Sequence, residues 1–447
     1  MDEIKMMIDK NQAQEICQKA MSFVKEGQAE VNMVQTVSPL TRIANNTIHQ
    51  NVETSDISLS LRVDIDGRSG RAATNQFDDD SLKALARKAS EAAKAITGQQ
   101  ELPPLMGPQK YRDIQSFDQS TALMEPEQRA EMVLKAVNLA KQEKVELAGL
   151  VSNLLYVNAL ANSNGLFAYH RMSQLTMEIT ARSGITAGRY AQTVRKAGDL
   201  DPEKVASIAI KKCLGGLNAR ALEPGEYTVI LEPEAVTTPL MFLSYLSFGA
   251  QSVQENLSCL SGKLGQKLMG DNITISDDAY HPLAVWAEPF DSEGMPKKKV
   301  TLIEKGVARG PVYDLKTAAK DNTETTGHGL PQPNTYGPMP RNIILEGGNS
   351  TLEDMIKSTQ RGVLVTRFWY NRVVDRKIPI ITGMTRDGTF LIEDGKISCG
   401  VKNMRYNQDL VEFFNNVETL GIPESQENMV VPPLKVNNFH FTGLTEA

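Results

Sequence analysis

The sequence of 447 residues predicts an α+β protein, in which a domain of duplicated helices and antiparallel strands precedes a strand-rich domain. In the first half, segments with helical periodicity alternate with segments in which apolar and polar residues alternate. The order of these segments recurs once, and short strands separated by turns predominate in the second half. We therefore predict an N-terminal α+β domain over residues 1–222 and a C-terminal β-rich domain over residues 223–447.

The first unit of the N-terminal domain is predicted to span residues 11–98, and its first helix is expected to end at Gly27. One face of that helix is apolar and is formed by Ile16, Ala20, Phe23 and Val24. The segments EVNMVQTVS, TRIANNTIHQ and DISLSLRVDI then predict antiparallel strands, which end in a turn at Asp66-Gly67. The stretch DSLKALARKASEAAKAITG predicts the closing helix, because it begins with a capping aspartate and ends with a glycine.

The second unit is predicted over residues 125–217, with the same order of a helix, strands and a helix. When ISLSLRVDIDGRSGRA at 57–72 is placed over LTMEITARSGITAGRY at 175–190, the apolar positions of the two strands coincide. The pair Gly70-Arg71 then falls on Gly188-Arg189. We interpret this agreement as an internal duplication, in which each unit buries one face of its strands under its helices.

A Pro-Gly turn in LEPGEYTV, residues 222–229, marks the predicted domain boundary. The strand YTVILE follows, and then the segment 237–262, TTPLMFLSYLSFGAQSVQENLSCLSG, which has the apolar periodicity of a core helix. Most of the remaining sequence predicts short strands. The exception is residues 321–341, DNTETTGHGLPQPNTYGPMPR, a long connection rich in proline and glycine. Such a connection contacts a ligand, is disordered or forms a packed cover, and the sequence leaves these alternatives open.

Charge and cysteine usage argue against several classes of protein. Lys and Arg number 48 against 54 Asp and Glu, and no long basic run could follow a phosphate backbone, so we expect no nucleic-acid partner. The N-terminal segment MDEIKMMIDKNQAQEIC is acidic and amphipathic, unlike a signal peptide. No stretch has the roughly 18 apolar residues of a membrane helix, so we expect no membrane partner. The four cysteines lie far apart without a CxxC pair, which favours a reducing cytoplasm.

Few residues have a spacing that indicates catalysis. The histidines are never three or four residues apart, so no helix presents two imidazoles to a metal ion. We expect structural or surface roles for them, with His328 in the connection 321–341 as the best candidate for a ligand contact: His49, His170, His281, His328 and His440. The carboxyls of Asp291 and Glu293 could act as an acid and a base, but FDSEGMP is also typical of a turn, which we favour.

The C-terminal half contains GEYTVILEPEAVTTPLMFLSYLSFGAQSVQENLSCLSG, FDSEGMPKKKVTLIEKGVARGPVYDLKTAAK, TTGHG, PMPR, GVLV and GTFLIEDGKI in succession. With RIANNTIHQ, LRVDIDGRSGRA and NSNG from the N-terminal half, these motifs resemble the TldD/PmbA family of bacterial and archaeal metallopeptidases, also described as modulators of DNA gyrase. The resemblance covers nearly the whole chain. The succession of motifs is specific, although each motif alone is weak.

The catalytic members of that family resemble HExxxH zinc peptidases, with two histidine ligands, a glutamate base and a cysteine ligand in the C-terminal stretch. When the pattern is laid without gaps over residues 225–262, the histidines fall on Met241 and Leu246 and the glutamate falls on Phe242. No cysteine follows Cys399. The resemblance therefore implies the PmbA (TldE) branch, and we expect no catalytic residue, no metal ligand and no cofactor in this chain.

Three functions are compatible with the sequence. The first, implied by the resemblance, is a non-catalytic subunit that pairs with a catalytic HExxxH sibling and holds an unfolded or extended peptide by strand addition. The second is a stand-alone homodimer that binds peptides or regulates another protein. The third is an enzyme with a relocated site, which requires the dispersed histidines to converge. We favour the first.

Overall fold

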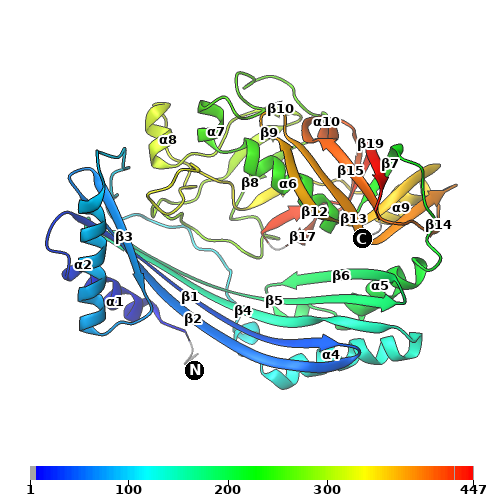
Figure 1. Ribbon diagram of the computed structural model, residues 1–447, viewed down its shortest axis with the longest axis horizontal. Helices are drawn as coiled ribbons and strands as arrows, with labels where there is room; N and C mark the ends of the chain where they lie inside the picture. Colours follow the sequence, from blue (N-terminus) through cyan, green and yellow to red (C-terminus); the bar gives the residue numbers. More distant parts are fainter. Residues whose placement is uncertain (1–6, 427, 446–447) are drawn as a thin grey trace.

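The computed structural model describes residues 7–426 and 428–445, and Figure 1 shows their arrangement. A sheet of long strands from the N-terminal half lies along one side of the molecule. A body of shorter strands and helices from the C-terminal half lies over it. This arrangement confirms the prediction of an α+β protein. Within the described residues, none of the helices combines the length and apolarity needed to cross a bilayer.

The N-terminal sheet is antiparallel at every pairing. Its strands are β1 (Gln28–Ala44), β2 (Thr47–Ile65), β3 (Arg68–Thr74), β4 (Glu146–Asn162), β5 (Phe167–Ser183) and β6 (Thr186–Val194). They lie in the order β3-β2-β1-β4-β5-β6, so the first strand of each predicted unit meets the other at the centre of the sheet. The order of helix, strands and helix recurs in the two units, as the predicted duplication requires. The duplication itself stays a prediction.

Helices cover one face of this sheet at its two ends (Figure 1). The apolar side chains of α1 (Lys10–Ser22) and α2 (Asp79–Ala95) pack against β1 and β2, and those of α4 (Pro126–Glu143) and α5 (Pro202–Gly215) pack against β4 and β5. The short α3 (Gln119–Ala122) and the 3₁₀ helix η1 (Ala197–Asp199) lie in connections. Helix α5 begins at Pro202, as predicted, because proline needs no N–H partner in the first turn.

The two faces of β4 and β5 have different neighbours, because successive side chains of a strand point to opposite sides. Val151 and Leu175 join the core beneath α4 and α5. Leu160 and Ala168 point the other way and pack with Phe290 of the C-terminal half. The alternating pattern therefore produces a sheet that packs against its own helices on one face and against the C-terminal half of the chain on the other.

The two Gly-Arg pairs occupy corresponding places in the structure. A Cβ atom on Gly70 would lie 2.2 Å from the Ala89 carbonyl oxygen of α2, and one on Gly188 would lie 2.3 Å from the Cys213 nitrogen of α5. Glycine is therefore required for each helix to pack this closely on its strand. The adjoining arginines reach the C-terminal half. Arg71 Nε donates to the Gln332 carbonyl at 2.9 Å, and Arg189 Nε donates to Glu234 at 2.8 Å.

Among the described residues, the C-terminal half forms two further sheets. The strands of the first, in spatial order, are β10 (Val307–Ala308), β9 (Val300–Glu304), β8 (Ile275–Asp277), β11 (Ile343–Leu345), β18 (Met429–Val431) and β17 (Glu424–Gln426). Those of the second are β12 (Arg361–Asp375), β7 (Gly225–Leu231), β19 (Leu434–Leu444), β15 (Met404–Asp409), β13 (Ile380–Glu393) and β14 (Lys396–Gly400), with β16 (Val417–Leu420) paired to β19. Strands β12 and β13 also pair with each other as a long hairpin.

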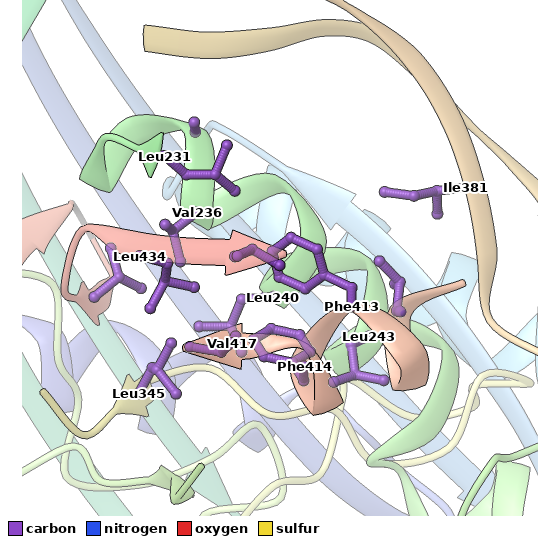
Figure 2. Close-up of a cluster of buried hydrophobic side chains, with 14 of the residues drawn as sticks. Leu231, Val236, Leu240, Leu243, Leu345, Ile381, Phe413, Phe414, Val417 and Leu434 are labelled. Atoms are coloured by element: carbon purple, nitrogen blue, oxygen red, sulfur yellow. The ribbon is translucent and has the colours of Figure 1, made fainter. Parts of the chain in front are cut away.

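The largest apolar core surrounds helix α6 (Pro233–Ser247), which follows β7 directly. Figure 2 shows Val236, Leu240 and Leu243 of α6 beside Phe413 and Phe414. The two phenylalanines belong to α10 (Leu410–Asn415). The remaining helices of this half are α7 (Ala250–Gln254), α8 (Leu315–Lys320) and α9 (Leu352–Lys357).

Two predicted helices have different bounds in the structure. The segment predicted as one helix over 237–262 begins earlier, at Pro233, and breaks after Ser247 before α7. The break lies at Gly249, where a Cβ atom would come within 2.4 Å of the Pro338 carbonyl oxygen, so close backbone contact replaces the helix. Helix α1 ends at Ser22 rather than at Gly27, because Gly27 lies against the Asp64 carbonyl at the start of the sheet.

Candidate functional site

Helix α6 carries Met241, Phe242 and Leu246, the three positions at which the resemblance predicts the metal site of the catalytic members. The Met241 side chain is 46% exposed, that of Phe242 is partly buried, and Leu246 is only 2% exposed. The prediction that the whole segment is core is therefore wrong for Met241, because this side chain lies on the outer face of the helix. None of the three side chains offers a nitrogen or carboxylate oxygen to a metal ion or a proton.

The histidines lie on separate elements. His49 is on β2, His170 on β5 and His440 on β19, while His281 and His328 lie in connections. Among the residues that the structure describes, no three His, Cys, Asp or Glu side chains are grouped so as to hold a metal ion. Cys399 on β14 is a free thiol, as are the buried Cys17, Cys213 and Cys259. The described residues therefore contain no group of ligands for a relocated metal site.

His328 is buried, 1% exposed, and contacts protein groups on both ring nitrogens. Its Nδ1 lies 2.9 Å from Thr326 Oγ1, and its Nε2 lies 2.9 Å from Asp277 Oδ1. The other carboxylate oxygen of Asp277 accepts the backbone N–H groups of Arg341 and Asn342, at 2.5 and 2.9 Å. Asp277 therefore links His328, in the first half of the connection 321–341, to Arg341 at its end. The part from 325 to 330 is mostly buried, whereas residues 321–324 and several residues after 330 are exposed, so the packed cover describes the buried part of the connection best.

Asp291 and Glu293 form the favoured turn, and both carboxyls are buried. Asp291 Oδ1 accepts the backbone N–H groups of Glu293 and Met295 at 2.9 and 2.8 Å, and Oδ2 accepts that of Gly329. Glu293 accepts the backbone N–H of Leu315 at 2.9 Å and the amide of Gln332 at 2.8 Å. Burial raises the pKa of both carboxyls. The negative charges of Asp291 and Asp314 raise the pKa of Glu293 further.

Replacing Glu293 by glutamine is expected to change how stability depends on pH. Because the pKa of Glu293 is raised above its ordinary value of 4.5, the folded protein holds this proton more tightly than the unfolded chain does. The unfolding free energy of the wild type should therefore fall as pH rises above that value, whereas glutamine does not titrate. Between about pH 5 and pH 8 the wild type should lose on the order of 1–3 kcal/mol relative to Glu293→Gln. Urea unfolding at both pH values measures this difference, and parallel curves would contradict it.

A pocket of about 310 Å³ lies where the N-terminal sheet meets the C-terminal domain. We call it the junction pocket, and it is lined by Leu154, Gln174, Trp286, Glu288, Lys297, Arg341, Asn342 and Asn428. Burial lowers the pKa of Lys297 and raises that of Glu288, whose carboxylate accepts the Asn158 side-chain amide at 2.7 Å. The Trp286 ring lies 5.0 Å from that of Tyr156.

Sequence reasoning did not find the junction pocket. Lys297 belongs to the run KKK at 297–299, where Lys297 is 7% exposed while the Lys298 and Lys299 side chains are about half exposed. No periodicity or composition distinguishes the buried lysine from its neighbours. Arg341 belongs to the motif PMPR, but nothing in the sequence connects it with Lys297 or with Gln174 of the distant strand β5.

The outer face of α6 adjoins the end of the hairpin of β12 and β13. Exposed apolar residues lie on both elements: Met241, Tyr245, Trp369, Tyr370, Val374 and Ile378. The Arg376 guanidinium at the end of the hairpin lies 5.9 Å from the Tyr245 ring, so the two elements adjoin there. We call these residues the α6–hairpin surface. Exposed aromatic residues with neighbouring arginines are typical of protein interfaces.

The structure is an α+β fold in which the largest apolar core surrounds helix α6. Family models for the PmbA/TldA metallopeptidase match residues 29–93 as domain 1, residues 121–217 as the central domain and residues 224–443 as the C-terminal domain. The chain therefore belongs to the PmbA/TldD metallopeptidase family, as the sequence motifs predict.

Individual relatives agree with this assignment. The metalloprotease PmbA of Escherichia coli O157:H7 is 25% identical over 408 residues, which are 86% of this chain and 86% of that protein. A metalloprotease TldD homolog of Haemophilus influenzae is 27% identical over 212 residues, only 46% of this chain and 42% of that protein. The crystal structure of TldE from Thermococcus kodakarensis superposes with a TM-score of 0.86 at 22% identity, covering 96% of this chain and all of that one. This last likeness shows the shared fold.

Proposed function

We propose that this chain is a non-catalytic subunit of a cytoplasmic PmbA/TldD-type peptidase, which pairs with a catalytic HExxxH sibling and holds unfolded or extended peptides. The observation that carries the proposal is the chemistry of α6 at Met241, Phe242 and Leu246. A thioether on the surface and two apolar side chains do not fit a zinc ion, which takes imidazole, thiolate or carboxylate ligands in peptidases.

The retained scaffold supports a role through shape and surface. Three family models match in succession, so the architecture persists although the residues of the metal site differ. The likeness to the PmbA relative extends over 86% of the chain, whereas the likeness to the TldD relative extends over 46%. This difference favours the PmbA branch.

The α6–hairpin surface is where we place the sibling. Tyr245 is 40% exposed and Trp369 is 44% exposed, and burying aromatic side chains of this kind contributes most to stable interfaces. Arg376 lies 5.9 Å from the Tyr245 ring, which gives this surface both apolar and charged groups for a complementary partner. A permanent pair should bury on the order of 2,000 Å² or more.

Mixing the purified chain with its HExxxH sibling is expected to produce peptidase activity that this chain alone lacks. The two proteins should co-elute as one species whose mass by light scattering is that of the pair, and the pair should cleave a disordered peptide. The variant Tyr245→Glu should fold normally but bind the sibling about ten-fold or more weakly, because a charge enters an apolar contact. The matched control is Ile185→Glu, since Ile185 is fully exposed in a turn of the other domain.

A sibling that is fully active alone and never co-elutes with this chain would overturn the subunit hypothesis. A homodimer of this chain that binds peptides without the sibling would instead identify the stand-alone binding protein. Pairing that Tyr245→Glu and Ile185→Glu weaken equally would show that the interface lies elsewhere.

A further inference from the structure

The junction pocket contains polar groups that the protein itself does not satisfy. Lys297 is 7% exposed, and among the described residues its Nζ has no hydrogen-bond partner. The Gln174 Oε1 atom is likewise buried without a hydrogen-bond partner in the part of the chain that the structure describes. Both residues line the pocket. Buried polar groups without partners are rare in folded proteins, so their coincidence in one pocket indicates a ligand.

The cationic side of the pocket is suited to an anion. The exposed Arg341 belongs to the lining, and Lys297 lies buried in the wall. The position of Arg341 is defined, because its backbone N–H donates to the buried Asp277 at 2.5 Å and its carbonyl accepts the Asn428 amide at 2.9 Å. Glu288 is the one carboxylate in the lining, and the Asn158 amide binds one of its oxygens. The buried carboxylates of Asp277 and Asp291 also act on Lys297, so the exposed Arg341 is the cation that an incoming anion would meet first.

The other side of the pocket favours an organic anion with an amide and an apolar group. Gln174 Oε1 is an acceptor, which the N–H group of an organic ligand would satisfy. The Trp286 ring and Leu154 provide an apolar wall. The volume of about 310 Å³ is at the lower end of the range for small-ligand sites, so it accommodates one amino-acid residue and not a long peptide.

We infer that the junction pocket binds the C-terminal residue of a peptide, with the carboxylate at Arg341 and Lys297 and the last backbone N–H at Gln174. The apolar side chain of that residue lies against Trp286 and Leu154. This inference rests on the proposed function for the presence of peptides. It adds that this chain recognises the free carboxyl end of its substrate, which a strand pairing through the backbone alone would not select.

Binding to the isolated chain tests the inference without the sibling or any cleavage. The sequence has two tryptophans, so the variant Trp369→Phe leaves Trp286 as the reporter of the pocket. The probes are acetyl-Ala-Ala-Leu with a free carboxylate and the same peptide with a C-terminal amide, titrated by tryptophan fluorescence and calorimetry. We expect saturable binding of the acid and about ten-fold or weaker binding of the amide, because the amide cannot pair with the cations.

Variants identify the residues that bind the carboxylate. Arg341→Gln and Lys297→Met should each weaken binding of the acid about ten-fold, while the amide should respond to neither. Arg341 is exposed, so its variant tests the inference even where Lys297→Met fails to fold. The matched control is Lys299→Met, which removes a lysine that lies outside the pocket and whose side chain is 56% exposed. This control should bind the acid as the wild type does.

Equal binding of the acid and the amide would overturn the inference, as would an unchanged affinity in Arg341→Gln. Binding of inorganic phosphate without binding of the peptide acid would overturn it too and would assign the pocket to a different anion. Because no sibling is present, these outcomes are independent of the pairing experiment. Absence of pairing would likewise leave the peptide titration interpretable.

Discussion

Replacing Leu246 by aspartate is expected to reduce the free energy of unfolding by about 3–5 kcal/mol, because the change removes apolar burial and places a charge in the interior. Leu246 is 2% exposed, near the end of the helix that the core surrounds. Urea unfolding followed by circular dichroism measures the loss. The second histidine of the family pattern falls on Leu246, so the experiment also tests whether the side chain at this position belongs to the core in this chain.

Met241→Asp is the matched control for Leu246→Asp, since it makes the same chemical change on the same helix. Met241 is 46% exposed, so we expect a change within about 0.5 kcal/mol. If the two variants lost equal stability, the outer and inner faces of α6 would not differ as the structure shows. If Leu246→Asp were as stable as the wild type, the residue would be accessible to solvent.

Replacing Lys212 by methionine is expected to destabilise the contact between the two halves of the chain by about 3–5 kcal/mol, because it leaves a buried carboxylate without its partner. Lys212 of α5 is 9% exposed, and its Nζ pairs with the carboxylate of Glu232, which is 7% exposed. Nζ also donates to the Arg189 carbonyl at 3.1 Å. Glu232 is the N-cap of α6, so this ion pair joins the N-terminal domain to the helix at the centre of the C-terminal core.

Lys211→Met is the matched control for Lys212→Met, because the neighbouring lysine on the same helix is exposed. It should unfold like the wild type within about 0.5 kcal/mol. The double variant Lys212→Met, Glu232→Met should recover much of the lost stability, since no unpaired charge remains. A double variant as unstable as Lys212→Met alone would show that packing, and not the ion pair, explains the effect.

Much of the fold could be predicted from the sequence, because helices and strands follow from the local spacing of apolar residues. The alternation in DISLSLRVDI predicts strand β2, and the pattern in DSLKALARKASEAAKAITG predicts helix α2. Helix ends were predicted less well. Gly27 and Gly249 are glycines because another part of the backbone lies against them, and that contact is not local.

The candidate site likewise has some features that the sequence alone determines and others that depend on the tertiary structure. The side chains at 241, 242 and 246 are a property of the sequence alone, so their lack of zinc-binding groups follows from the alignment with the family pattern. Which of them is buried was decided by the tertiary structure, because the helix places Leu246 inward and Met241 outward. Asp291 and Glu293 were correctly predicted in a turn, but the burial that raises their pKa values depends on the connection 321–341 folding over them.

By itself, the sequence determined the family, the fold class and the apolar character of the helix on which the resemblance places the metal site. Only the tertiary structure decided that Lys297, and not Lys298 or Lys299, is buried, and that it shares a pocket with Gln174 and Arg341. The physical reason is the range of the interactions. Periodicity and side-chain chemistry act over a few residues, whereas the burial of one polar group depends on segments that lie far apart in the chain and meet only when the two domains pack together.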